Sequence, residues 1–405
     1  MMKAILFFIL LISLNVVHAQ NGQWCIFGIQ DTVTGITGKE NEIWAATQNA
    51  GIKMLDKATG DIITFDVNSG VVSTNRFRCI KYLHQTIYAG TFSDGFYTFQ
   101  NNIWSHFDTL NSGLAGNNIT DFIFDSIENA VWIATDKGLS KWKDNSWENF
   151  DSINSGLAGN VLTSLYLDEN NILWIGTRFA GMSKLQEGLF TTFNYDNAGI
   201  NDNWVRTIFA DTSGMMYVAD YFGVDKYDPV EDIWLYVFNQ MTSGLSNERV
   251  NKMVLDHQNN LWFATHEGIT KWDMIDYWEQ FYTSNSDLPH NTSDALYVDS
   301  ENLVWAGTQG GLAAYTFSGY LFPDFPIEMA VNPNPCTDIL HADIKNADKI
   351  RLFNMLGDEI FEKSTGNEFI GEYALDIDLR NYASGVYIIV ASSGDDYKIQ
   401  KIIKF

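Results

Sequence analysis

The segment Val131-Trp132-Ile133-Ala134-Thr135 is one of seven similar stretches of the chain, and a glycine follows each within a few residues. The second position of every stretch is aromatic, and successive aromatic residues are 42 to 45 residues apart. Nothing in this part of the sequence shows the apolar period of a helix. A regular period of this length indicates an array of equivalent units. The aromatic residues are Trp44, Tyr88, Trp132, Trp174, Tyr217, Trp262 and Trp305.

Each unit divides into four short strands, as its third copy shows. Residues 120–125 alternate between apolar and polar side chains, and residues 131–135 are continuously apolar. Two further short strands follow at 139–142 and 147–150, after turn residues such as Asp136-Lys137-Gly138. Short strands with regular turns are typical of all-β folds, and four strands per unit of about 43 residues indicate a propeller. The sequence therefore predicts a seven-bladed β-propeller.

The outer strands indicate how the ring closes. In six units the outer strand carries a large apolar residue followed three or four positions later by Phe. The seventh such pair, Trp24 and Phe27, precedes the first unit instead of following the last. We expect residues 23–28 to be the outer strand of blade seven, because this would join the two ends of the ring and hide a sheet edge. Residues 320–322 are the alternative for that place.

The segments on either side of the ring are expected to serve export and connection. A positive start is followed by an apolar run and by Val17-His18-Ala19, the small or tolerated residues of a cleavage site. Residues 1–19 are therefore predicted to be a secretory signal peptide, since the run is too short to span a membrane. The propeller would extend over residues 20–318, and the prolines after it indicate a linker at 319–326. No other segment predicts a membrane span.

The chain is strongly acidic, with 25 basic and 50 acidic residues and a net charge of -25. This charge argues against nucleic acids and anionic membranes as partners, because both require a positive field. It also disfavours anionic glycans, unless Lys137, Arg178 or Arg206 forms a local positive patch. The surface is that of a protein kept soluble by its charge.

The sequence predicts no metal and no cofactor. The acidic turns at 168–171, 256–260 and 299–302 lack the oxygen-ligand spacing of a calcium loop, and Asp and Asn also stabilise turns by bonding to their own backbone. There is no metal-type Cys/His cluster, phosphate-binding glycine loop or nucleophile elbow. Three scattered cysteines cannot form a disulfide framework and are expected to be buried thiols: Cys25, Cys79 and Cys336.

The repeat motif is specific enough to suggest a family. Its core, W-[IF]-[GA]-T-x-x-G-[LI], and the Asn-Ser-Gly-Leu loops at 111–114 and 154–157 resemble the propeller repeats of two-component regulators. Such repeats occur in extracytoplasmic sensor regions of hybrid histidine kinases and in free-standing secreted proteins. The resemblance covers about residues 23–318 and implies the propeller fold with a ligand-sensing face. It does not carry over signalling, because the sequence shows no kinase or DNA-binding segment.

Residues 327–405 are predicted to form a small Ig-like β-sandwich of short strands with glycine turns. Its motifs, in the order N-P-N-P, L-G, S-G-V-Y and K-I-I-K, resemble the type A C-terminal sorting domain of the type IX secretion system. The residues that carry this resemblance are Asn332, Pro333, Asn334, Pro335, Gly357, Gly385, Val386, Tyr387, Lys401 and Lys404.

This second resemblance implies a destination. A bacterium of the Bacteroidota type would export the chain by the Sec pathway, and the type IX machinery would recognise residues 327–405 and carry the protein across the outer membrane. Sorting domains of this type are typically cleaved, and the passenger is released or tethered to surface lipopolysaccharide. We therefore expect a protein that is secreted or displayed on the outer cell surface of a Gram-negative bacterium.

Ligand sites of propellers usually lie on one face, where loops between second and third strands and connections between blades converge on the central channel. Variation among otherwise regular loops is where function tends to lie. Here the loops carry aromatic, basic, acidic and amide side chains instead of one repeated residue. The candidate ligand-binding residues are Gln48, Asn49, Phe92, Asp94, Asp136, Lys137, Arg178, Phe179, Asp220, Tyr221, His266 and Gln309.

These loops favour a non-catalytic module that binds a ligand, either a glycan or a peptide. The alternative is an enzyme of lyase or hydrolase type, in which His266 beside Glu267 could act as a general acid–base pair. Streptogramin lyases are seven-bladed propellers with similar Trp-rich repeats that use a histidine, and His290 lies on the same predicted face. A third interpretation is an accessory role in surface attachment, because the type IX machinery contains a larger, two-propeller protein with such a sorting domain.

Overall fold

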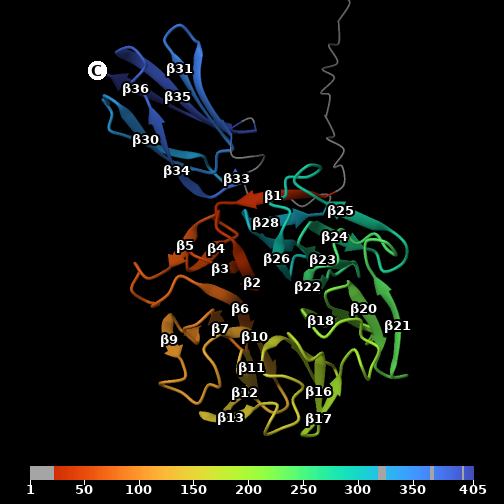
Figure 1. Ribbon diagram of the computed structural model, residues 1–405. Coiled ribbons are helices and arrows are strands. Elements are labelled where there is room, and N and C mark those ends of the chain that lie inside the picture. The colour runs from red at the N-terminus through yellow and green to blue at the C-terminus, as the bar shows by residue number, and fades with distance from the viewer. Residues whose placement is uncertain (1–21, 318–324, 365–368, 395) are drawn as a thin grey trace, which may run out of the picture.

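The computed structural model describes residues 22–317, 325–364, 369–394 and 396–405. Within these residues every regular element is a β-strand. They contain no helix long and apolar enough to cross a membrane. The strands form a ring of seven sheets and a smaller domain beyond its rim (Figure 1). The predicted signal peptide and most of the predicted linker lie outside the described residues.

Each blade is an antiparallel sheet whose strands follow one another from the channel to the rim. Blade one consists of β2 (Val33–Lys39), β3 (Glu42–Thr47), β4 (Ile52–Asp56) and β5 (Ile62–Phe65). Blade two consists of β6 (Phe77–Leu83), β7 (Thr86–Thr91), β8 (Phe96–Gln100) and β9 (Ile103–Phe107). Blade three consists of β10 (Ile119–Asp125), β11 (Ala130–Thr135), β12 (Gly138–Lys143) and β13 (Ser146–Phe150).

The remaining four blades repeat this plan. Blade four consists of β14 (Leu162–Leu167), β15 (Leu173–Thr177), β16 (Met182–Gln186) and β17 (Leu189–Phe193). Blade five consists of β18 (Thr207–Ala210), β19 (Met216–Ala219), β20 (Val224–Asp228) and β21 (Ile233–Phe238). Blade six consists of β22 (Val250–Leu255), β23 (Leu261–Thr265), β24 (Gly268–Trp272) and β25 (Trp278–Phe281). Blade seven consists of β26 (Ser293–Val298), β27 (Val304–Thr308), β28 (Gly311–Thr316) and β1 (Gln23–Phe27). The predicted seven-bladed propeller is confirmed.

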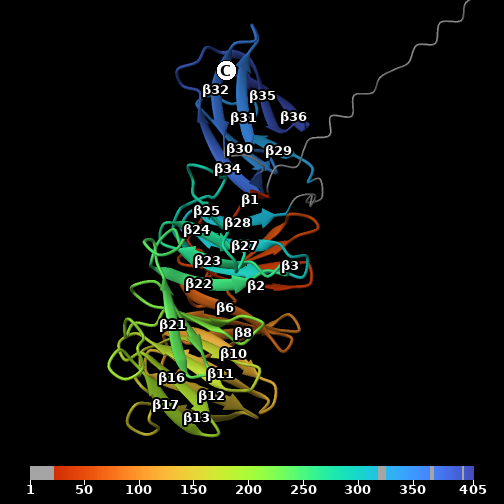
Figure 2. The same ribbon diagram turned by 90° about the vertical axis from the view of Figure 1, so that its right-hand side faces the viewer.

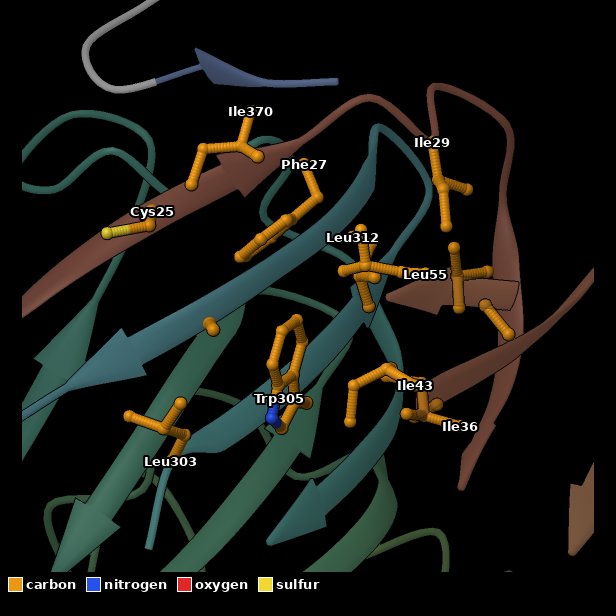
Figure 3. Packing of buried hydrophobic residues seen from close by; sticks show 14 residues of the cluster. Cys25, Phe27, Ile29, Ile36, Ile43, Leu55, Leu303, Trp305, Leu312 and Ile370 are labelled. Atoms are coloured by element: carbon orange, nitrogen blue, oxygen red, sulfur yellow. The ribbon is translucent and has the colours of Figure 1, made fainter. Parts of the chain in front are cut away.

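Blade seven joins strands from both ends of the propeller. β1 runs antiparallel to β28, with Trp24 opposite Tyr315 and Phe27 opposite Leu312. Phe27 packs against Trp305 with 4.8 Å between ring centroids, in a core that continues into blade one (Figure 3). Separating the two ends would expose this core and a sheet edge, so the N-terminal strand locks the first and last blades together.

A buried threonine fixes the loop after the second strand in six blades. Its hydroxyl donates to the carbonyl of the following loop glycine at 2.7–2.9 Å. The same oxygen accepts a backbone N–H from within the loop. In blade five Asp220 takes this place. The threonines are Thr47, Thr91, Thr135, Thr177, Thr265 and Thr308.

The three acidic turns considered for calcium use their carboxylates internally. The leading aspartate of each, Asp168, Asp256 or Asp299, accepts backbone N–H groups of its own turn through Oδ1. Its Oδ2 accepts the indole N–H of the tryptophan six residues later, at 2.8–3.0 Å. These aspartates therefore join the turn to the core of the blade.

The C-terminal domain packs two sheets around one core. One sheet consists of β29 (Glu328–Asn332), β30 (Ile339–Lys345) and β34 (Glu372–Asp378). The other consists of β32 (Glu359–Ser364), β31 (Lys349–Asn354), β35 (Gly385–Ser393) and β36 (Asp396–Lys404). Leu340, Ile350 and Ile389 are fully buried between them. The expected β-sandwich is confirmed, and the three cysteines of the chain are buried free thiols, as predicted.

The first and last motifs of this domain meet in space. Asn334 donates through Nδ2 to the carbonyl of Lys401 at 2.7 Å and accepts the N–H of Ile403 at 3.0 Å. The N–H of Cys336 also donates to the carbonyl of Ile403. The N-P-N-P segment and the closing K-I-I-K segment are therefore one structural feature.

The domain contacts the propeller at its rim. A short strand, β33 (Phe369–Ile370), pairs with β1 and becomes the fifth strand of blade seven. In a view turned by 90° the domain lies in line with the disc and covers neither of its faces (Figure 2). The loops around the channel mouth therefore stay open while the domain is attached.

Candidate ligand-binding face

One face of the propeller is formed by the loops after the second strands and by the connections between blades; we call it the loop face. In six blades the residue after the second strand donates its N–H to a carbonyl at the end of the preceding connection, at 2.9–3.4 Å. This ladder places variable residues of two separate segments side by side. The pairs are Gln48–Thr32, Phe92–Arg76, Asp136–Asn118, Arg178–Val161, His266–Arg249 and Gln309–Thr292.

The connections are stiffened by their own side chains. In five of them an asparagine Oδ1 accepts the N–H of the residue eight positions earlier, at 2.7–2.9 Å. Loops ordered in this way lose little further entropy when a ligand binds. The asparagines are Asn75, Asn117, Asn160, Asn203 and Asn291.

A β-bulge at the start of the first strand redirects one side chain in six blades. Bulges commonly re-aim side chains near functional sites. Here the bulged residue reaches the neighbouring blade: Arg78, for example, donates through Nη1 to Asn118 at 2.8 Å. Arg206 precedes the first strand of blade five and donates to Asn251 in the same manner. The bulged residues are Thr34, Arg78, Thr120, Thr163, Asn251 and Asp294.

The loop face holds all the arginines of the propeller. Each lies over an aromatic ring, at 4.6–5.7 Å from the ring centroid. Within the described residues none of them forms an ion pair with a carboxylate. In a chain of net charge -25, this concentrates positive charge on one surface. The arginines are Arg76, Arg78, Arg178, Arg206 and Arg249.

The centre of the cluster is the indole of Trp204. Arg178 and Arg206 both lie over this ring, at 4.9 and 4.6 Å. The buried Nε of Arg206 has no hydrogen-bond partner among the described residues. Burial lowers the pKa of Arg206, and repulsion from Arg249 and Arg178 lowers it further. Asp294 offsets part of this repulsion without forming an ion pair, and an anion placed among the guanidinium groups would relieve the rest.

Blade six contributes a second half of the cluster. Arg249 lies 5.2 Å from the ring centroid of Tyr221 and donates through Nη2 to its hydroxyl at 3.1 Å. His266 is half-buried beside them, and its pKa is lowered by burial and by the charges of Arg206 and Arg249. The imidazole of His266 is therefore neutral at neutral pH.

Blade two extends the cluster in the other direction. Arg76 and Arg78 lie 5.2 and 5.7 Å from the ring centroid of Phe92. Burial lowers the pKa of Arg78, and the charge of Arg178 adds to this effect. The cluster thus includes arginines of blades two, four, five and six, and Arg178 lies close enough to Arg78 to lower its pKa.

The structure brings five predicted candidates together at this cluster: Phe92, Arg178, Phe179, Tyr221 and His266. Phe179 and Tyr221 are 68% and 41% exposed, as expected of rings that a ligand could contact. Asp136 lies near Arg78, with Lys137 beside it. The other candidates, Gln48, Asn49 and Gln309, lie on loops of blades one and seven that carry no arginine.

Two predicted candidates serve the fold instead. Asp94 accepts hydrogen bonds from the hydroxyls of Ser73 and Tyr97 through Oδ2, at 2.5 and 2.8 Å. Asp220 is completely buried and accepts the N–H of Phe222 through Oδ1. Burial and the neighbouring Asp225 raise the pKa of Asp220 to about 8.

The residues of the enzymatic alternative are placed on the same face but are not paired. The ring of His290 accepts the N–H of Thr292 at 2.9 Å, which is a turn contact. Glu267 accepts from Asn247 at 3.2 Å. In the part of the chain that the structure covers, no carboxylate hydrogen-bonds or ion-pairs with the ring of His266 or His290. The same part contains no group of His, Cys, Asp and Glu arranged to hold a metal.

Sequence reasoning missed four residues of the cluster. Arg76, Arg78, Trp204 and Arg249 lie at the ends of the connections, where no glycine marks an equivalent position. The sequence did contain a signal for them. Each of these residues belongs to a triplet at the start of a first strand, in which an apolar residue stands between two polar residues or between an aromatic and a polar residue. These triplets are Arg76-Phe77-Arg78, Trp204-Val205-Arg206 and Arg249-Val250-Asn251.

The channel below the mouth is also positive. Lys81 of β6 lies 3.6 Å from Asp121 of β10. Lys252 of β22 has its pKa lowered to about 8, first by the charge of Lys81 and then by burial. Lys81 is three residues deeper in its strand than Arg78, which corresponds to about 10 Å along the strand.

The ring of seven sheets with its appended sandwich defines a β-propeller protein with a second, C-terminal β-domain. Residues 330–405 match the family model of the secretion system C-terminal sorting domain. Residues 156–179 and 244–267 match the model of the two component regulator propeller. The chain is therefore a propeller of the two-component-regulator repeat type that carries a sorting domain, as its motifs predicted. The sorting domain indicates export to the cell surface or secretion, and it implies interaction with the secretion machinery.

Solved structures share this architecture at low sequence identity. The extracellular domain of the hybrid two component system BT3049 from B. thetaiotaomicron superposes with a TM-score of 0.65 at 16% identity, over 95% of this chain and 57% of its own. PorZ, a surface component of the type-IX secretion system of Porphyromonas gingivalis, gives 0.55 at 16% identity, over 93% and 60%. This chain thus spans somewhat more than half the length of either protein.

A third similar structure is matched over almost its whole length. Streptogramin B lyase superposes with a TM-score of 0.59 at 12% identity, over 73% of this chain and 98% of its own. All three likenesses concern the fold. Comparison with curated protein sequences gives no match.

Proposed function

We propose that this protein is a non-catalytic binding module of the bacterial surface, and that its loop face binds an anionic glycan. The observation that supports this best is the set of five arginines, each over an aromatic ring and none paired with a carboxylate in the described residues. Guanidinium groups bind carboxylates through paired, charge-assisted hydrogen bonds. The ligand is therefore expected to supply the negative charge that the fold omits.

The aromatic side chains favour a glycan over an acidic peptide. Phe179, Tyr221 and Phe222 expose 68%, 41% and 53% of their surface around the cluster. Flat, exposed rings beside polar groups suit amphipathic ligands with one apolar and one polar side, such as sugar rings. A polysaccharide of uronic acid units would place its carboxylates on the arginines and its ring faces on these aromatic residues.

The test measures the binding of the full-length protein to an acidic and to a neutral polysaccharide. We expect binding to polygalacturonate and not to dextran, with an affinity that falls as salt is added. The double variant Arg178→Gln/Arg206→Gln should lose tenfold or more in affinity, because a hydrogen bond to a charged group contributes about 1.5–3 kcal/mol.

A matched variant controls for net charge. Lys39→Gln/Lys143→Gln removes the same two charges near turns of the opposite face and should bind within about twofold of the wild type. Equal losses in the two double variants, or equal binding of dextran and polygalacturonate, would contradict the proposal. Selective binding of an acidic peptide such as polyglutamate would support the location of the binding site but contradict a glycan as its ligand.

One observation favours the enzymatic alternative. His266 is a half-buried imidazole whose pKa is lowered, which is the state required of a general base at neutral pH. If the protein is a lyase or hydrolase, incubation with a bound ligand should release product, and His266→Ala should abolish release while leaving binding intact. Intact ligand after prolonged incubation would leave binding as the function.

A further inference from the structure

The sorting domain is attached to the propeller by strand pairing as well as by the chain. β33 runs parallel to β1, with Ile26 opposite Phe369 and Phe27 opposite Ile370. The N–H of Gly28 donates to the carbonyl of Ile370 at 2.5 Å. β33 thereby covers the outer edge of blade seven, the edge at which the ring itself is closed (Figure 1).

The pairing depends on a close approach of two glycines. A Cβ atom on Gly28 would lie 2.9 Å from the Cα of Gly371, and one on Gly371 would lie 2.6 Å from the Cα of Gly28. Both distances are shorter than carbon–carbon contact allows. Gly371 also has a φ of 135°, which only glycine adopts readily. A side chain at either position would therefore force the two domains apart.

Asn346 holds this segment to the rest of the sorting domain. It is buried; its Oδ1 accepts the N–H of Gly371 at 3.0 Å and its own N–H donates to the Gly371 carbonyl at 2.9 Å. Its Nδ2 donates to the carbonyl of Pro326 at 3.2 Å. The β33 segment is thus a fixed projection of the sandwich that is already shaped to meet β1.

Apolar and charged contacts extend the interface on both sides of β33. Ile370 is 8% exposed and joins the core of blades one and seven, where Phe325 also packs. Ile370 and Phe325 both lie against Gly60 in blade one. Lys345 of the sandwich forms an ion pair with Asp61, which extends the contact beyond blade seven.

We propose that this interface holds the sorting domain on the propeller after the connecting segment is cut, so that separation of the two parts requires the loss of the β1–β33 pairing. Every contact named above between the sandwich and the propeller joins a residue before position 318 to one after position 324, so a cut between these positions removes none of them. The partner of the β1 edge is therefore the sorting domain itself, bound by strand addition.

The test introduces a protease site within residues 319–323 of the full chain. After complete cleavage, verified on a denaturing gel, the two fragments should elute together in gel filtration at about 10 μM, a concentration suited to interfaces of modest affinity. Gly28→Val in the same background should elute as two fragments, because its side chain meets Gly371. Gln23→Val, at the opposite exposed end of β1, is the matched control and should stay together.

Hydrogen exchange keeps the proposal testable if the cut Gly28→Val protein aggregates. In the uncut chain the amide of Gly28 should exchange slowly in the wild type and rapidly in a Gly371→Ala variant, whose change lies outside the propeller. Separation of the cut wild-type fragments, or co-elution of the cut Gly28→Val fragments, would overturn the proposal.

Discussion

The two faces of the propeller use polar residues in opposite ways. At the turns opposite the loop face, both oxygens of Asp299 are engaged: Oδ1 by two backbone N–H groups, and Oδ2 by Trp305 and by the buried ammonium of Lys57. On the loop face the guanidinium groups rest on rings, and within the described residues they lack carboxylate partners. The bonding of a turn aspartate to the aromatic residue six positions later recurs at equivalent positions in four blades, with Tyr217 in place of tryptophan in one of them. The arginines over rings follow no such repeat.

This difference separates what the fold requires from what a ligand can use. An aspartate whose every lone pair is occupied stabilises its turn and offers nothing to solvent. An arginine held over an indole keeps most of its donors free and already oriented. Repetition thus marks the first kind of residue, and departure from the repeat marks the second.

The largest expected effect comes from removing a turn carboxylate. Asp299→Ala leaves the indole of Trp305 without an acceptor and removes one of the two acidic partners of Lys57, which is 5% exposed. Breaking a buried ion pair from one side costs about 3–5 kcal/mol. We expect a loss of this size in the free energy of unfolding, measured by urea denaturation.

The loop face supplies the comparison variant. Arg178→Ala also removes a charged side chain, but an exposed one on the loop face. It should change the free energy of unfolding by less than about 0.5 kcal/mol, as is usual for exposed positions. If the two variants are destabilised equally, the distinction between a structural and a ligand-binding face is wrong.

A smaller effect is expected where one residue departs from the repeat inside the core. Asp220 stands in the place of the repeated threonine, with its carboxyl buried beside the carboxyl of Asp225, which raises its pKa. Asp220→Thr should restore the hydroxyl bond to the loop glycine carbonyl. We expect a gain of about 1–3 kcal/mol at pH 9, the typical desolvation penalty of a buried polar group.

The pH dependence identifies the cause of that gain. The pKa of Asp220 is about 8 in the folded protein and lies near 3.8 when unfolded. As pH rises from 4 to 8, the unfolded chain loses this proton while the folded protein keeps it, so the wild type loses stability in that window. The gain of Asp220→Thr should grow over the same window, and the reverse change Thr177→Asp should create such a dependence in blade four. A gain independent of pH would show that the carboxylate is not responsible.

The ring could be predicted because its signal repeats. Each second strand carries Trp or Tyr, is buried on both sides and is followed by a glycine in a tight loop, so seven copies reinforce one interpretation. Trp24 and Phe27 indicated the closing strand because the pair of apolar residues typical of an outer strand is missing after the last unit and is present before the first. The structure places β1 beside β28.

Only about half of the residues of the site could be predicted from the sequence, because the others do not occupy positions that repeat from blade to blade. Arg178 and Tyr221 follow a repeated threonine position and could be found by counting, whereas Trp204 and Arg249 end connections of varying length. The bulge that redirects Arg78 shifts the strand register by one residue, and no residue type in the sequence requires it. Asp220 was interpreted as a loop residue, although its alignment with six buried threonines was a signal that it points inward. The two-residue strand β33 is too short to leave any pattern.

The smallest expected effect concerns the charge of His266 on the loop face. Its pKa is lowered by burial and by the charges of Arg206 and Arg249, so the imidazole gains a proton only at a pH below the usual range of histidine. An additional positive charge beside the arginines should strengthen binding of polygalacturonate, whose carboxylates stay ionised, by about two- to threefold between pH 7 and pH 5. His266→Gln should lack this increase. Burial also raises the pKa of Asp294. Because Asp294 is present in both the wild type and His266→Gln, its contribution to the pH dependence is the same in the two proteins. Identical pH profiles for the wild type and His266→Gln would place the bound anion away from blade six and confine the ligand site to Arg178, Trp204 and blade two.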